Sequence, residues 1–222
     1  MKKAHCLLLA ITLTLTACGG SGGGGKKESA AKISQDLKPD SGSLDPAPYS
    51  NGRVPAAALS FDASVDFLNA TANQAVKFDR AIEILKLVVA TEEFRSRVLN
   101  YTYQGVKHFV DNNGLSNSQI YQAILDGAEK LKPNKNNTID LQVEIYTADN
   151  NIVGYTYPNV SKIWVNTKFF NNYTAAGVAH NLMHEWLHKI GFGHDAAATP
   201  SRPYSVPYAI GKIVADIGKD FL

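Results

Sequence analysis

Three histidines and one glutamate in the last fifth of the chain have the residue types and the spacing of a metal site. They are His184, Glu185, His188 and His194. On an α-helix, residues four apart differ by about 40° around the axis, so His184 and His188 project from the same face. Imidazole nitrogens bind zinc at about 2.0–2.1 Å, and a catalytic zinc site has three protein ligands and a fourth position for water. The pair therefore requires a third ligand from outside its helix.

Gly191 and His194 can supply that third ligand. Glycine adopts positive φ without steric cost, so Gly191 suits the point at which the helix ends and the chain turns sharply. His194, three residues later, can then swing back and complete a three-histidine site. Glu185 lies about 60° from His188 around the helix, which places its carboxylate where it can act as a general base on water. The pattern predicts a zinc-dependent hydrolase with one Zn²⁺ ion as cofactor.

Two other interpretations of this pattern stay open. In one, the helix is an ordinary amphipathic helix with hydrogen-bonded histidines, and its core contacts come from Leu182, Met183, Trp186, Leu187 and Ile190. In the other, the metal only holds loops in place, and the chain is a catalytically weak or inactive surface protein that captures a partner. The long pattern, which includes Gly191 and His194, is far rarer by chance than the short one. Glu185 also favours catalysis, since a structural zinc site usually closes its fourth position with another ligand.

The run from His184 to His194 resembles the signature of the metzincin peptidases. The resemblance implies hydrolysis of peptide bonds by an endopeptidase, although zinc chemistry alone would also serve other amides. It implies an α+β (α/β-like) fold, in which a twisted mixed sheet lies behind the active-site helix and a loop-rich lower part ends in a C-terminal helix. An extended substrate would lie along the edge strand of that sheet, which falls here on Gly154, Tyr155 and Thr156.

The chain departs from the metzincin pattern after the third histidine. That family has a methionine in a tight turn beneath the metal, often followed two residues later by a tyrosine. The two methionines of this chain are Met1 and Met183, so by resemblance Val206 takes the place of the methionine and Tyr208 that of the tyrosine. Tyr208 would then stabilise the oxyanion of the reaction, and a purely structural tyrosine is the alternative.

The remaining polar neighbours are not expected to bind the metal. His180 lies one turn before His184, and a helix turn of about 5.4 Å places it too far along the axis, so we expect packing or a hydrogen bond behind the ligands. His108 stands alone without metal spacing. Asp195, directly after His194, resembles the adamalysin branch of the family, and a local hydrogen bond to the turn is the equal alternative.

The N-terminus resembles the signal of a bacterial lipoprotein. Two lysines precede an apolar run at residues 7–15, which ends in Leu-Thr-Ala-Cys. We expect residues 1–17 to be a signal peptide that is removed and Cys18 to be lipidated, with a simple signal peptide as the alternative. The apolar run is too short to span a bilayer of roughly 30 Å. Gly19, by resemblance to lipoproteins of diderm bacteria, favours the outer membrane of the cell envelope.

Composition divides the rest of the chain into two parts. Residues 18–58 are rich in Gly, Ser, Lys, Asp and Pro, which predicts a flexible tether with a reach of about 30 Å. Residues 59–222 have the length of one catalytic domain. The net charge of +2 carries no basic block, so nucleic acid is not an expected partner. The expected partners are a peptide or protein substrate and, through the anchor, the membrane, with the domain itself a monomer.

Hydrophobic periodicity predicts the elements that must position the site. An amphipathic helix begins near Phe78 and continues past Thr91 towards Leu99. Ser116 and Gln119 form a capping box that opens a second helix over residues 120–131. Three strands follow, at residues 139–145, 152–157 and 161–167. The helix of the histidines is capped by Asn171, Asn172 or Thr174, and a closing helix runs from Ala209 to Leu222.

Overall fold

The structure is a computed structural model, and it describes residues 61–221. The expected signal peptide, the tether and the lipidation site Cys18 lie outside the described residues. Within residues 61–221, six α-helices and a four-stranded mixed sheet confirm the predicted α+β fold. None of these helices combines the length and the apolar character that crossing a membrane requires.

The sheet has the strand order β1-β2-β4-β3. Its strands are β1 (Asp62–Leu68), β2 (Thr138–Tyr146), β3 (Gly154–Thr156) and β4 (Lys162–Asn166). Strands β1, β2 and β4 are parallel, and β3 pairs with β4 in the antiparallel direction. The three predicted strands are present, and β3 is the predicted edge strand. The sequence reasoning missed β1, although Ala63, Val65 and Phe67 alternate there with polar residues.

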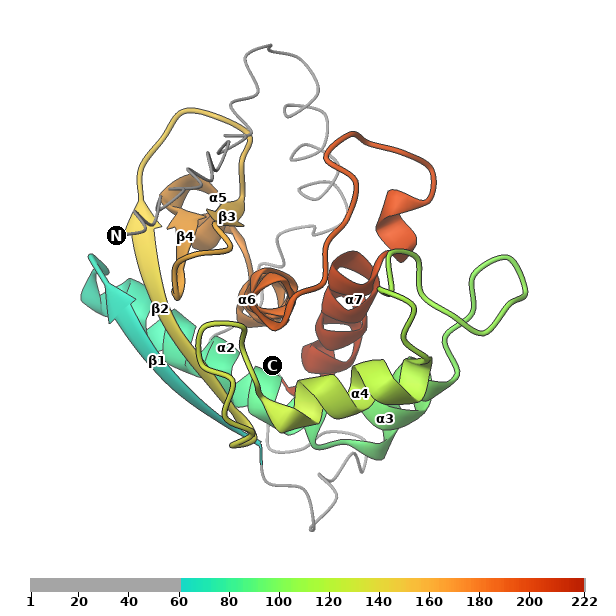
Figure 1. Cartoon of the computed structure of the whole chain (residues 1–222). Coiled ribbons are helices and arrows are strands. Elements are labelled where there is room, and N and C mark those ends of the chain that lie inside the picture. Colours follow the sequence, from blue (N-terminus) through green and yellow to red (C-terminus); the bar gives the residue numbers. More distant parts are fainter. Residues whose placement is uncertain (1–60, 222) are drawn as a thin grey trace, which may run out of the picture.

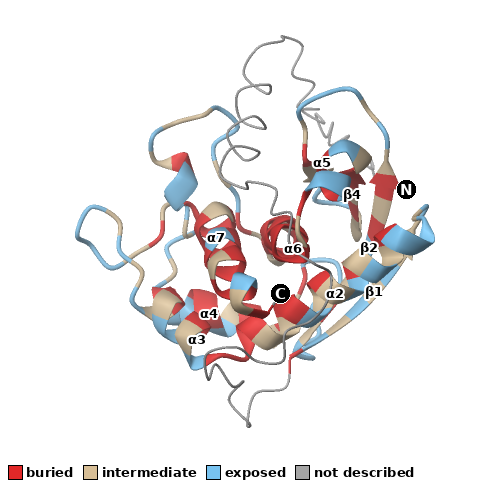
Figure 2. Cartoon of the chain, turned by 180° about the vertical axis from the view of Figure 1, so that it is seen from behind, coloured by how far each residue is buried: buried red, intermediate tan, exposed pale blue. Residues whose placement is uncertain are grey.

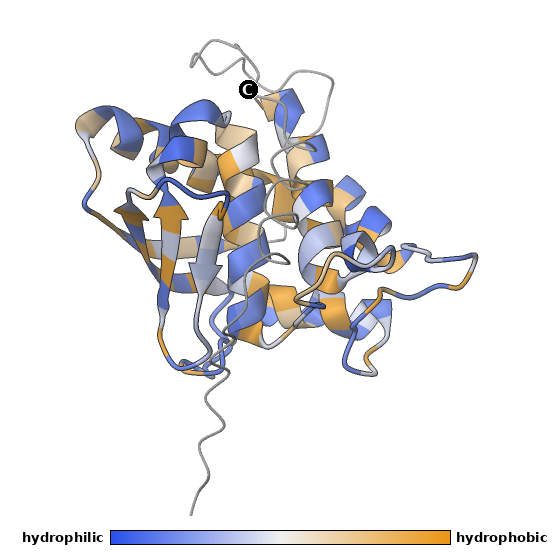
Figure 3. Ribbon diagram, turned by 90° about the horizontal axis from the view of Figure 1, so that it is seen from above, coloured by the Kyte–Doolittle hydropathy of each residue, from blue (hydrophilic) through white to orange (hydrophobic). Residues whose placement is uncertain are grey.

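The helices cover one side of the sheet and surround a central helix. They are α2 (Ala72–Val89), α3 (Glu92–Leu99), α4 (Asn117–Asp126), α5 (Thr167–Asn172), α6 (Ala175–Ile190) and α7 (Val206–Gly218). Figure 1 shows α6 end-on at the centre, with the sheet on one side and α7 on the other. Hydrophilic and hydrophobic residues lie side by side on the helices (Figure 3), as expected for amphipathic helices that line a core.

Two predicted helix boundaries are corrected by capping and burial. The first helix is divided at Thr91, whose hydroxyl accepts a hydrogen bond from the amide of Phe94 and so begins α3. The Ser116–Gln119 capping box opens α4 as predicted, but α4 ends at Asp126 and not at residue 131. The helix ends because Gly127 adopts a left-handed conformation with φ +65°, and beyond it the buried carboxylate of Glu129 accepts a hydrogen bond of 2.7 Å from the indole of Trp186.

Helix α6 is capped by Thr174, one of the three predicted candidates. Every residue of α6 except His188 and Ile190 is buried, and Figure 2 shows this burial along the helix. Helix α7 begins at Val206, three residues before the predicted start at Ala209, because Pro207 suits the first turn of a helix. A Cβ atom on Gly211 of α7 would lie 2.6 Å from the His180 ring, so only glycine allows this close approach of α7 to α6.

Replacing Gly211 with alanine is therefore expected to destabilise the fold. Alanine favours a helix by about 1 kcal/mol over glycine, but overpacking typically costs about 1–3 kcal/mol. We expect Gly211→Ala to lower the free energy of unfolding by about 1 kcal/mol, measured by urea denaturation. Because the clash is with the His180 ring, the change should cost less in a His180→Ala background. A Gly211→Ala protein that is as stable as the parent would contradict this account of the packing.

Candidate metal centre

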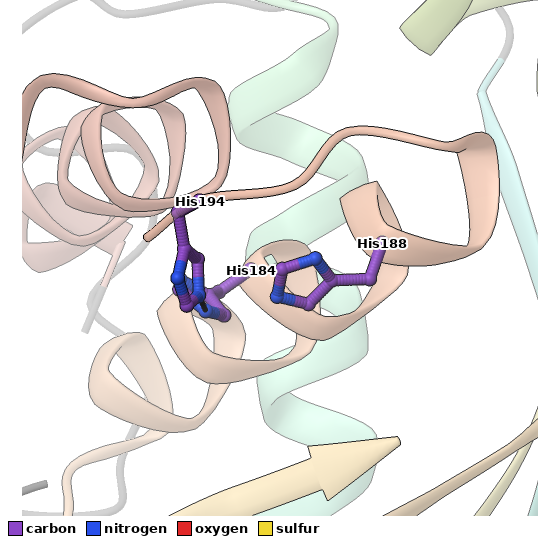
Figure 4. A group of neighbouring side chains, drawn as sticks. All are labelled: His184, His188 and His194. Carbon is purple, nitrogen blue, oxygen red and sulfur yellow. Dashed lines mark hydrogen bonds between the residues drawn. The ribbon is translucent and has the colours of Figure 1, made fainter. Parts of the chain in front are cut away.

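The three predicted histidines converge at one point. His184 and His188 project from α6, and His194 comes back from the loop that follows it (Figure 4). One ring nitrogen from each lies within 4.8 Å of the others, and the Nε2 atoms of His184 and His194 are 3.3 Å apart. Two nitrogens held tetrahedrally at about 2.05 Å from zinc would be about 3.3 Å apart. The cluster therefore has the dimensions to hold a metal ion.

Backbone carbonyls orient two of these rings. The Nδ1 atom of His188 lies 2.8 Å from the carbonyl oxygen of Phe192, and that of His194 lies 2.9 Å from the carbonyl oxygen of Asp195. An Nδ1–H group that donates to a carbonyl leaves the lone pair of the ring on Nε2, the nitrogen that faces the cluster. Both rings are thus held in the tautomer that metal binding requires, and the donor set fits a divalent ion such as zinc.

Gly191 turns the chain as the sequence predicts. Its φ is +125°, a backbone conformation that residues other than glycine rarely adopt. The amides of Gly191 and Phe192 both donate to the carbonyl of Leu187, which closes the end of α6. The side chain of Phe192 is buried, which anchors this turn in the core. The backbone carbonyl of Phe192 at the same time accepts a hydrogen bond from His188.

Hydrogen bonds between residues close in the sequence organise the segment between His194 and α7. The Asp195 carboxylate accepts a hydrogen bond of 3.0 Å from the Thr199 hydroxyl, so the local hydrogen bond, one of the two alternatives for Asp195, is present. The Thr199 hydroxyl accepts in turn from the amide of Arg202, and the Arg202 guanidinium donates to the carbonyl of Ala196. These bonds fold the loop back on itself, so that its end lies beside its beginning.

Tyr208 borders the histidines from the first turn of α7. Its ring centroid is 4.5 Å from that of His184 and 4.8 Å from that of His194. Arg202, which sequence reasoning missed, places its guanidinium carbon 5.0 Å from the centre of the Tyr208 ring. A single arginine in a loop has no spacing that would reveal such a contact. Val206, the residue in the place of the family's methionine, is completely buried.

Glu185 is buried beside the histidines, with 5% of its surface exposed. Burial raises the pKa of Glu185 to about 8, and the charge of Lys189 on the same helix partly opposes that rise. The charge of Glu185 also contributes, after burial and Tyr155, to raising the pKa of Tyr146 to about 12. Tyr146 is the last residue of β2, and its hydroxyl donates to the carbonyl of Ile152.

Burial also shifts the pKa values of the histidines. It lowers the pKa of His188 to about 4 and lowers the pKa values of His184 and His194 as well. All three are consequently neutral at pH 7, the state in which imidazole binds a metal. His180, buried against Gly211, has its pKa lowered to about 4 for the same reason. It is not among the converging ligands found within residues 61–221, as predicted.

The other residues singled out in the sequence lie on the edge strand and away from the histidine cluster. Gly154, Tyr155 and Thr156 form β3 at the sheet edge, and Asn181 of α6 packs against Gly154 just before the first histidine ligand. The ring of Tyr155 stacks on Trp164, with centroids 5.1 Å apart. Their binding of a substrate stays a prediction. His108 lies apart from the cluster, with its Nδ1 atom 2.9 Å from a backbone carbonyl oxygen.

Comparison of the chain with protein-family models, curated proteins and solved structures finds no significant match in any of the three. The resemblance to metzincins therefore depends on the residues from His184 to His194 and on their arrangement. The arrangement establishes the coarser statement, that the three histidines form a cluster able to hold a metal ion.

The histidine pKa values predict how stability depends on pH. An unfolded histidine has a pKa of about 6.5, whereas His180, His184, His188 and His194 have pKa values lowered by buried or partly buried surroundings. Below pH 6.5 the unfolded chain binds more protons than the folded one, so the free energy of unfolding falls as the pH falls towards 4. The raised pKa values of Glu129 and Glu185 act in the opposite direction, but they involve fewer groups.

We therefore expect the metal-free protein to unfold at a lower urea concentration at pH 5 than at pH 7. The measurement is a pair of urea titrations in the presence of a chelator. An equal or higher midpoint at pH 5 would show that the histidines are not buried in the neutral form.

Proposed function

We propose that this chain is a zinc-dependent endopeptidase that acts on peptides or proteins on the extracytoplasmic side of a bacterial membrane. The observation that supports it most is the convergence of His184, His188 and His194 with a buried carboxylate, Glu185, on the same helix. Three neutral imidazoles leave a fourth position around a zinc ion for water. A glutamate beside such a position is the arrangement used for hydrolysis, and a metal that only holds loops in place does not need it.

Each residue of the site has a defined part in this reaction. A bound zinc ion supplies a Lewis acid that activates water and polarises a carbonyl group. Glu185 takes a proton from the attacking water on a carboxylate oxygen and passes it to the nitrogen of the leaving amine. Tyr208 donates its hydroxyl proton in a hydrogen bond to the developing oxyanion.

Strand β3 provides the surface on which an extended peptide would lie. An edge strand offers backbone amides and carbonyls to a further strand, so a substrate can pair with β3 by main-chain hydrogen bonds. Gly154 of this strand packs against Asn181, one helical turn before Glu185. A peptide paired with β3 would thus run alongside the helix that carries the histidines.

The lipidation of Cys18 belongs to the same proposal and depends on the sequence of the first eighteen residues. An anchored cysteine followed by a tether of residues 18–58 would hold the domain clear of the lipid headgroups. The proposed location is the cell envelope, with the outer membrane favoured by Gly19. Mass spectrometry of the membrane fraction would detect a diacylated or triacylated Cys18, and an unmodified N-terminus would contradict the anchor.

Replacing Glu185 with glutamine should separate metal binding from catalysis. Glutamine has nearly the same shape but cannot accept the proton, so we expect about a 10²- to 10⁴-fold loss of peptide hydrolysis with zinc retained. The measurements are zinc content and the cleavage of a mixed peptide library, with and without a chelator. His194→Ala is the matched control, because it should lose zinc and activity together. Substantial hydrolysis by Glu185→Gln would remove Glu185 from the mechanism.

Replacing Tyr208 with phenylalanine tests the oxyanion role. Phenylalanine keeps the ring against His184 and His194 but lacks the hydroxyl, so we expect turnover to fall about 10²-fold while zinc affinity stays unchanged. Steady-state kinetics and zinc titration of the two proteins give both values. An unchanged turnover number would make Tyr208 a structural residue only.

A further inference from the structure

The ammonium group of Lys189 connects the helix of the histidines to the end of the edge strand. Lys189 lies in the last turn of α6 and is only 5% exposed. Its Nζ atom donates a hydrogen bond of 2.7 Å to the carbonyl of Tyr157 and a second one to the carbonyl of Val160. A buried ammonium is costly unless it is hydrogen-bonded, so these two carbonyls are tied firmly to α6.

Both carbonyls belong to the turn that leaves β3. Strand β3 ends at Thr156, Tyr157 follows it directly, and Val160 lies just before β4 begins at Lys162. Tyr157 is 55% exposed, and its ring lies edge-on to the rings of Tyr155 and Trp164. The backbone of this turn is thus held by Lys189. Lys189 itself follows the histidine His188 directly and lies one helical turn after Glu185.

We propose that Lys189 is a positioning residue, which fixes the edge strand β3 relative to the histidine cluster so that a bound peptide is aligned with it. This inference rests on the proposed function. A substrate aligned by β3 is cleaved efficiently only if the strand and the cluster keep a constant separation. A displacement of about 1 Å can reduce the rate about 10²-fold, so the two hydrogen bonds of one side chain are enough to matter.

The segment after α4 offers a matched control. Lys130 is exposed and lines the same small pocket as Lys189, together with Pro158 and Ser161. Its side chain lies against Gly191. Lys130→Met therefore removes a nearby positive charge without removing the hydrogen bonds to Tyr157 and Val160.

The test compares Lys189→Met, Lys189→Arg and Lys130→Met in the full chain. For Lys189→Met we expect unchanged zinc content and a tenfold or larger loss of kcat/KM on extended peptides. The rate on a blocked amide too short to reach β3 should fall less than the rate on extended peptides, because that reaction loses only the Lys189 charge near Glu185. Lys189→Arg, which keeps buried N–H donors, should recover part of the loss, and Lys130→Met should behave as the parent does.

Hydrogen exchange provides a readout that does not depend on activity. In Lys189→Met, the amides of residues 154–160 should exchange at least tenfold faster, while those in the middle of α6 stay protected. Unchanged exchange in that segment, a loss of zinc, or an equal loss of activity on short and extended substrates would overturn the inference. If the parent protein cleaves no peptide at all, the proposed function fails, and the exchange result alone still decides whether Lys189 holds β3.

Discussion

The burial of α6 is the constraint on which the rest of this structure depends. A helix that is buried on nearly every side is normally apolar, yet this one carries His180, His184, Glu185 and Lys189 among its buried residues. Each polar group removed from water must be neutral, hydrogen-bonded or bound to a metal, because an unpaired buried charge is costly. The lowered histidine pKa values and the raised pKa of Glu185 express this cost.

Hydrogen bonds from the adjacent loop and from distant segments meet that constraint. Carbonyls of the loop after α6 hold His188 and His194. The turn after β3 accepts from Lys189, and Glu129 accepts both from Trp186 and from the backbone of β2. The bonds that satisfy the buried polar groups also position the cluster relative to the sheet. Stability and geometry of the site thus depend on the same contacts.

A buried valine anchors the start of α7 in the core. Val206 fills a completely buried position at the start of α7, and the backbone there pairs with Val110 from a distant loop. Because Val206 opens a helix, Tyr208 projects from its first turn towards the histidines, with the Arg202 guanidinium over its ring. A fixed helical turn orients a side chain more rigidly than a free loop does.

The sequence by itself determined the features that depend on residues close together in the chain. Helical spacing placed His184 and His188 on one face, Gly191 required a turn at positive φ, and alternation identified β2 and β4. The Ser116–Gln119 capping box marked the start of α4, and Thr174 was among the three candidate caps of α6, since a cap depends only on residues within one turn. What only the tertiary structure decided depends on contacts between distant segments. Lys189 donates hydrogen bonds to the turn after β3, and Glu129 accepts one from Trp186 across more than fifty positions of sequence. The pattern of hydrophobic residues cannot predict such contacts. They form only after α6 is buried, because a polar group that has lost water then requires a hydrogen-bond partner.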